Sequence, residues 1–152
     1  MLRRSLALAG LLLLPAAAGR AADAAPDRFE RVEVATTKTS IYLGTVTMTM
    51  PAFVRDPGGY ASRYEARVFP FFFASERGRL SVSIADAQLA RLARGEAVDF
   101  SGRAVNEDGD ERRIEGRATP ADAASGKLKV RVFVSRRIEL IFNTTYRFPG
   151  VP

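Results

Sequence analysis

Alternating apolar and polar residues are the dominant pattern of the chain from about residue 30 onward. Residues that alternate in this way place one set of side chains on a buried face of a β-strand and the other set in water. The pattern predicts seven or eight short strands, at residues 32–34, 40–50, 62–74, 80–84, 98–104, 114–118, 128–134 and 138–148. Strands of this length and spacing are typical of antiparallel folds. We therefore predict a mainly β domain, a closed barrel or else a rolled sheet or sandwich; closure is favoured because it removes exposed sheet edges.

One segment departs from the two-residue period. Leu89 and Leu92 are spaced to lie on one face of a helix, and Arg91 and Arg94 would lie in its last turn. Asp86 precedes them as a candidate N-cap, and Gly95 follows at the position where helices end. The spacing predicts one short helix near residues 87–94, stable only if its leucines pack on the sheet.

Several interruptions of the alternation predict where the strands bend or end. The apolar parity changes across Gly44, which predicts a β-bulge inside the strand at residues 40–50. Residues 56–59 read Asp-Pro-Gly-Gly and predict a turn, as do residues 76–78, and residues 119–126 predict a loop. Residues 135–137 contain no glycine, proline or asparagine, so a tight turn and one long bent strand both fit there.

The acidic segment at residues 106–111 joins two strands whose register can be predicted. A two-residue turn would place Phe100 opposite Arg117 and mix the apolar and polar faces. A three-residue loop at residues 107–109 places Phe100 opposite Gly116, with a glycine at the left-handed loop position. Asp99 then lies opposite Arg117 on the wet face. We therefore predict the three-residue loop.

The N-terminal residues have the order of a secretory signal peptide. Arg3 and Arg4 precede an apolar run at residues 6–14, and Ala22-Asp23-Ala24 provides a small-residue cleavage site. The run is shorter than the ~20 apolar residues that a membrane-spanning helix needs. We predict cleavage after Ala24, a single domain at residues 25–152 with a loose tail at 149–152, and a periplasmic or secreted location. An uncleaved apolar N-terminal helix is the alternative.

The composition narrows the chemistry that this domain can perform. The chain contains no cysteine and no histidine, which removes disulfides, thiolate nucleophiles, the commonest general base and the commonest metal ligands. The formal net charge of +6 bears on partners rather than on the fold. We predict no catalytic residue, no metal site and no cofactor.

Acidic residues leave two chemical alternatives to weigh. The 106–111 segment resembles a calcium loop, but Ala104 would occupy the first ligand position and has no side-chain oxygen, so a solvated hairpin tip is the better interpretation. A pair of carboxylates can hydrolyse glycosides without histidine. Every Asp and Glu is expected in a turn or on an outward face, so a carboxylate-based hydrolase remains a second alternative function.

The best candidate for a binding site is a phenylalanine cluster formed by Phe69, Phe71, Phe72 and Phe73. One face of this cluster can join the core, which leaves the other face with more aromatic surface than a sheet requires. If that face is exposed, it marks a partner, ligand or membrane surface; if the N-terminal segment, the helix or the C-terminal tail covers it, it is a second small core. We predict a binding module whose partner is an apolar ligand or another protein and not nucleic acid; association with a membrane is the less favoured alternative.

Two dibasic pairs are candidates for anion binding, Arg112-Arg113 and Arg136-Arg137. Adjacent residues of a strand point to opposite faces, so neither pair would form a clamp by itself, and ordinary surface arginine is the alternative.

The end of the last predicted strand, residues 143–148, alternates aromatic residues and finishes at Phe148. This segment resembles the closing strand of bacterial outer-membrane barrels. The resemblance covers six residues and implies a small outer-membrane barrel as the first alternative function, with the membrane association that this fold entails.

Overall fold

The structure, a computed structural model, describes residues 29–151, so the signal-peptide prediction lies outside the described residues. Ten strand segments, one α-helix and one 3₁₀ turn make up the described chain. They are β1 (Arg31–Val34), β2 (Thr37–Ile41), β3 (Gly44–Thr49), β4 (Phe53–Asp56), β5 (Gly59–Phe69), η2 (Phe72–Ala74), β6 (Glu76–Ser83), α1 (Asp86–Ala93), β7 (Val98–Asn106), β8 (Glu111–Pro120), β9 (Ser125–Phe133) and β10 (Glu139–Arg147).

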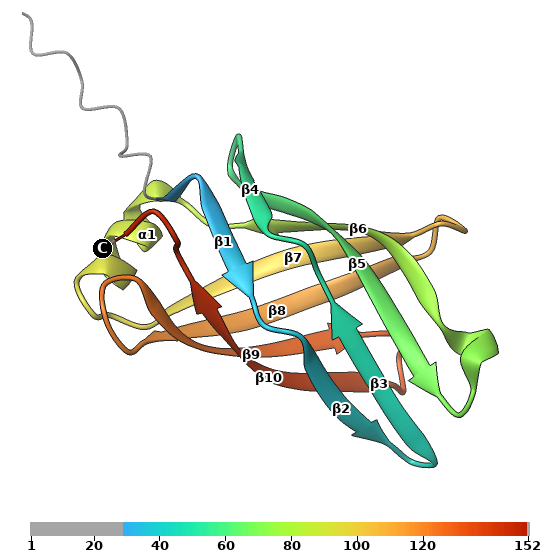
Figure 1. Cartoon of the computed structure of the whole chain (residues 1–152). Helices are drawn as coiled ribbons and strands as arrows, with labels where there is room; N and C mark the ends of the chain where they lie inside the picture. Colours follow the sequence, from blue (N-terminus) through green and yellow to red (C-terminus); the bar gives the residue numbers. More distant parts are fainter. Residues whose placement is uncertain (1–28, 152) are drawn as a thin grey trace, which may run out of the picture.

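The strands form a closed, eight-stranded antiparallel barrel (Figure 1). Each of the pairs β1–β2 and β3–β4 makes one interrupted strand of the barrel, which reconciles ten segments with eight strands. Closure takes place where the first strand meets the last, with Val34 opposite Tyr146. The predicted fold class, a mainly β barrel with one short helix, is confirmed.

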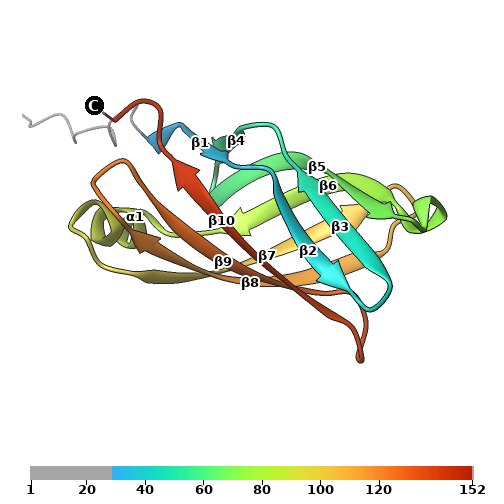
Figure 2. The same cartoon turned by 60° about the horizontal axis from the view of Figure 1, so that its bottom comes forward.

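The two ends of the barrel differ in what covers them (Figure 2). At one end, here called the helix end, lie α1, the β4–β5 turn and the β8–β9 connection. At the other, here called the loop end, lie the β2–β3, β5–β6, β7–β8 and β9–β10 connections.

Alternation along the strands fills the interior with apolar side chains and leaves charged ones outside. On β9, Leu128, Val130 and Val132 face inward, whereas Lys127 and Lys129 face water. The interior face of β5 is likewise buried at Tyr64, Ala66 and Val68. Burial of these apolar faces is the main driving force for the barrel.

The predicted register of the β7–β8 hairpin is confirmed. Phe100 lies opposite Gly116, and Asp99 opposite Arg117 with 2.8 Å between carboxylate and guanidinium. The loop closes at Gly109, whose φ of +85° is the left-handed conformation that the prediction required. The ring of Phe100 occupies the space above Gly116, where a Cβ would lie 2.1 Å from a ring carbon.

The predicted bulge near Gly44 is wrong, because the chain turns there completely. Tyr42 and Leu43 form a two-residue turn, and Ile41 pairs with Gly44 across the β2–β3 hairpin. A two-residue turn changes the parity of the apolar positions just as a bulge does, so the pattern did not distinguish them. Glycine is needed because a Cβ at position 44 would lie 2.1 Å from the Phe69 carbonyl oxygen.

Three other predicted boundaries also change. The strand predicted at residues 62–74 ends at Phe69, and Phe72–Ala74 forms a 3₁₀ turn. The turn predicted at residues 76–78 is wrong because β6 begins at Glu76. The loop predicted at residues 119–126 is shorter, since β8 continues to Pro120 and β9 begins at Ser125.

Of the two arrangements that fitted residues 135–137, the structure has the tight turn. In this turn the Val134 amide donates to the Ile138 carbonyl.

The predicted helix is confirmed, with Leu89 and Leu92 buried and Gly95 at a φ of +86°. Its N-cap is Ala85 rather than Asp86, and the Gln88 side chain accepts the Ala85 amide at 2.9 Å. The same side chain donates to the Asp99 carbonyl at 2.6 Å, which ties α1 to β7. Within residues 29–151, helices long and apolar enough to cross a membrane are absent.

Candidate functional site

Inward-facing side chains line a cavity of about 120 Å³ between the middle of the barrel and its helix end. Its wall is built by inward-facing apolar residues of the strands and by Leu89 and Leu92 of α1. Three of the residues that border it bind their hydroxyl groups to backbone carbonyls of the barrel. Thr37 donates to the Asn143 carbonyl at 2.9 Å, Thr144 to the Ala35 carbonyl at 2.8 Å, and Tyr60 to the Phe29 carbonyl at 2.6 Å. The lining is therefore apolar throughout.

An apolar cavity of this size has a defined chemical preference. Water enters a cavity only where polar partners replace its lost hydrogen bonds, and apolar cavities of about 150 Å³ stay dry and accept benzene-sized molecules. The barrel interior therefore offers a place for a small apolar group and none for a polar one.

Arg55 is an inward-facing charge at the helix end, and sequence analysis missed it. Its guanidinium lies 5.1 Å from the centre of the Tyr60 ring and forms an ion pair with Asp86 at the start of α1. The sequence already indicated its inward position, because Arg55 follows the buried Phe53 by two residues and so lies on the same face of the strand. This ion pair ties α1 to β4 over the helix end of the barrel.

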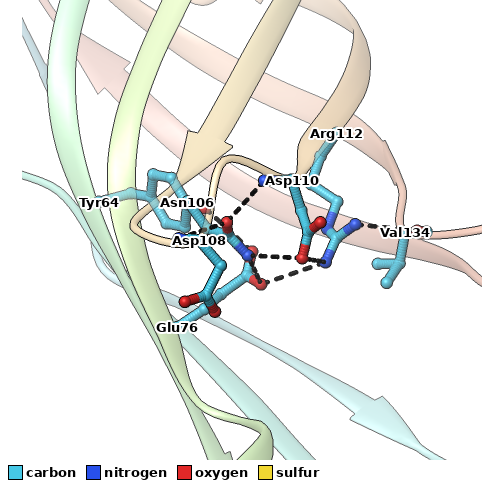
Figure 3. Close-up of polar contacts among 7 residues, drawn as sticks. All are labelled: Tyr64, Glu76, Asn106, Asp108, Asp110, Arg112 and Val134. Atoms are coloured by element: carbon cyan, nitrogen blue, oxygen red, sulfur yellow. Dashed lines mark hydrogen bonds and ion pairs between the residues drawn. The ribbon is translucent and has the colours of Figure 1, made fainter.

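A polar network lies inside the barrel wall at the loop end and is centred on Glu76 (Figure 3). The Tyr64 hydroxyl donates to Glu76 Oε1 at 2.9 Å. The Asn106 amide and the Arg112 guanidinium both donate to Glu76 Oε2, at 3.2 and 3.3 Å. One carboxylate thus joins β5, β6, β7 and β8.

The hairpin loop completes the network. The Asn106 side-chain oxygen accepts the backbone amides of Asp108 and Asp110, and its nitrogen donates to the Asp110 carboxylate at 3.3 Å. Arg112 also donates to the Val134 carbonyl at 3.3 Å, which adds β9 to the connected elements. The network orders the acidic tip as part of the barrel, in keeping with its interpretation as a hairpin tip (Figure 3).

The position of Glu76 overturns one expectation. Every carboxylate was expected in a turn or on an outward face, but Glu76 begins β6 in phase with Leu80 and Val82 and faces inward. Both of its oxygens accept hydrogen bonds from groups of the barrel itself. Because these bonds fill the site, its geometry favours a structural role over acid–base chemistry.

No family model, curated protein or solved structure matches this chain. A functional proposal therefore rests on the geometry of the barrel itself.

The phenylalanine cluster lies at the loop end, away from the cavity. Phe69, Phe72 and Phe73 are exposed, whereas Phe71 is half-buried and packs against the core. The rings form two edge-to-face pairs, Phe69 with Phe72 at 5.7 Å and Phe71 with Phe73 at 5.9 Å between centres. Of the two arrangements considered from sequence, the exposed one describes most of this cluster. Ligand or partner binding by these residues stays a prediction.

The four candidate anion-binding arginines are not brought together. Arg112 belongs to the polar network, while Arg113 on the outer wall pairs with Glu115 at 2.6 Å and covers the Phe133 ring. Arg136 and Arg137 are exposed in the β9–β10 turn. Anion binding by these residues stays a prediction. In the described part of the chain, acidic side chains do not gather in a group of three that could hold a metal ion.

Three buried tyrosines make the stability of the barrel sensitive to alkaline pH. Burial raises the pKa of Tyr64, and its hydrogen bond to Glu76 raises the pKa further; burial also raises the pKa of Tyr60 and Tyr146. An unfolded tyrosine loses its proton near pH 10, while the folded one keeps it. The protonated tyrosines therefore contribute their full share of the folding stability below about pH 10. This contribution is lost as the pH rises towards the pKa that each tyrosine has in the folded chain.

We expect the free energy of unfolding, measured with urea, to fall above about pH 10, by up to about 1.4 kcal/mol per pH unit for each shifted tyrosine. Tyr64→Phe removes one such group, so its pH profile should be flatter than that of the parent chain. If the free energy of unfolding fell equally steeply with pH in both proteins, Tyr64 would not be a source of the alkaline loss of stability.

Proposed function

We propose that this protein is a non-catalytic binding module that holds a small apolar ligand inside its barrel. The observation that carries the proposal is the cavity of about 120 Å³ whose lining is apolar throughout. Eight-stranded barrels are just wide enough either to be filled by side chains or to hold one small ligand. Here the cavity wall on β8 includes Ala118, whose single methyl group takes up little of the interior, which supports the second arrangement.

The distribution of charge supports a barrel surrounded by water. Outward-facing residues of β8 and β9 include Arg113, Arg117, Lys127 and Lys129, while the interior is apolar. A lipid-spanning barrel has the reverse arrangement, with an apolar outer band and a polar interior. This observation favours a water-soluble binding module over the outer-membrane alternative. The filled hydrogen bonds of Glu76 give the hydrolase alternative little support.

Toluene is a suitable probe of the cavity, and the chain without residues 1–24 is the protein to test. We expect saturable binding by calorimetry and a melting temperature that rises with toluene concentration. Ala118→Leu adds three carbon atoms to the cavity wall and should weaken binding by about tenfold or more.

Thr119→Leu is the matched control, because Ala118 is buried and lines the cavity whereas the adjacent Thr119 is exposed. It should bind toluene as the parent chain does. The proposal fails if the parent chain does not bind toluene, or if the two leucine variants bind it equally well.

A further inference from the structure

Apolar side chains project from the loop end of the barrel into solvent. Tyr42 is 98% exposed and Phe73 is 88% exposed, so most of the surface of both side chains is in contact with solvent. We call the exposed large apolar residues of this end the apolar rim: Tyr42, Leu43, Phe69, Phe72, Phe73 and Ile138. Isolated surface apolar residues need no explanation, but a group gathered at one end indicates an interaction surface.

Two of the connections that carry the apolar rim are direct neighbours. Thr45 of β3 lies opposite Phe69 of β5, and Gly44 packs against the Phe69 backbone. The β2–β3 turn therefore stands beside the phenylalanine loop. Figure 2 shows both connections reaching beyond the barrel wall at this end, as separate projections.

Basic residues accompany the rim in the β9–β10 turn. Arg136 and Arg137 directly precede Ile138 and are exposed, and within residues 29–151 neither has an acidic group within ion-pair distance. The acidic residues Glu107 and Asp108 occupy the tip of the remaining connection, on the side of β6 and β7. The loop end is thus apolar on the β2–β3 and β5–β6 connections, apolar and basic on the β9–β10 connection, and acidic on the fourth.

We propose that the apolar rim docks on the surface of a lipid bilayer. Tyr42 and Phe73 are almost entirely exposed on two different connections, and the lipid headgroups and acyl chains of a bilayer can rearrange around each of them. Aromatic side chains are favoured at the membrane interface, and arginines beside them suit the lipid phosphates. The acidic tip restricts contact to the β2–β3, β5–β6 and β9–β10 connections, so the barrel axis is tilted on the membrane. This inference goes beyond ligand binding in the cavity and does not depend on it.

Vesicle co-sedimentation tests the docking, with the chain without residues 1–24 so that the apolar run at residues 6–14 does not contribute. The probes are vesicles of phosphatidylcholine alone and of phosphatidylcholine with phosphatidylglycerol. We expect binding to both, stronger with the anionic lipid because of Arg136 and Arg137. Tyr42→Ser and Phe73→Ser should each weaken binding by about tenfold, since each removes one aromatic side chain from the interface.

Val54→Ser is the matched control, because Val54 is an exposed apolar residue on β4, towards the helix end. It should bind vesicles as the parent chain does. All three variants replace exposed side chains, and their melting temperatures verify that they fold.

Absence of vesicle binding by the parent chain, or a loss of binding in Val54→Ser equal to that in the rim variants, would overturn the proposal. So would concentration-dependent self-association by sedimentation that Phe73→Ser abolishes, because it would assign the rim to a protein interface. Toluene binding by the rim variants should be unchanged, which separates this test from that of the cavity.

Discussion

Replacing Glu76 with alanine is expected to lower the free energy of unfolding by about 3 kcal/mol. The substitution removes the acceptor of three hydrogen bonds and leaves the half-buried Arg112 guanidinium without its nearest carboxylate. Arg112 already carries a buried Nε that lacks a hydrogen-bond partner, so the remaining bonds of its guanidinium matter more. Urea unfolding at neutral pH measures the loss.

Two further variants show whether this loss belongs to the network. Glu76→Gln keeps an acceptor for Tyr64 but removes the charge that faces Arg112, so its loss should lie between those of the parent chain and Glu76→Ala. Glu139→Ala breaks the exposed ion pair with Arg131 on the outer wall and should change stability little. If Glu76→Ala were as mild as Glu139→Ala, the network would not stabilise the loop end.

Gly59→Ala is expected to destabilise the barrel by at least about 3 kcal/mol. A Cβ at position 59 would lie 1.7 Å from the carbonyl oxygen of Val82, which is an impossible contact. That oxygen belongs to the backbone of β6, so relief requires β5 and β6 to separate where they pair at Gly59 and Ser83. Thermal and urea unfolding measure the effect.

Gly109→Ala is the appropriate comparison. Its added Cβ meets open space, and its φ of +85° alone should cost about 1 kcal/mol. A loss at position 59 no larger than that at position 109 would mean that the β5–β6 pair adjusts easily, which is contrary to a tightly closed barrel.

The parity of apolar residues was enough to predict the barrel interior, because one side of each strand must avoid water. The β7–β8 register followed from the same rule, since only one loop length put Phe100 opposite the glycine that accommodates its ring. The rule fails where parity is uninformative. Three consecutive phenylalanines after Pro70 carry no alternation, so the end of β5 at Phe69 was invisible in the sequence.

The candidate sites were harder to predict than the fold. Glu76 precedes Gly78 and was assigned to a turn, although its parity with Leu80 already indicated an inward position. A cavity depends on the total volume of the side chains that all the strands place in the interior. A pattern within one segment of the sequence cannot predict that volume. The exposed positions of Phe72 and Phe73 depend on a loop that leaves the sheet, which the sequence did not reveal.

The pairing of β1 with β10 also determines when the barrel can form during synthesis. Val34 cannot find its partner Tyr146 until nearly the whole polypeptide has been made, so closure has to be a late event. Until then the first and last strands both have free edges that can associate with other molecules. A chain truncated before β10 would keep those edges permanently, and we expect it to aggregate rather than to form a smaller stable domain.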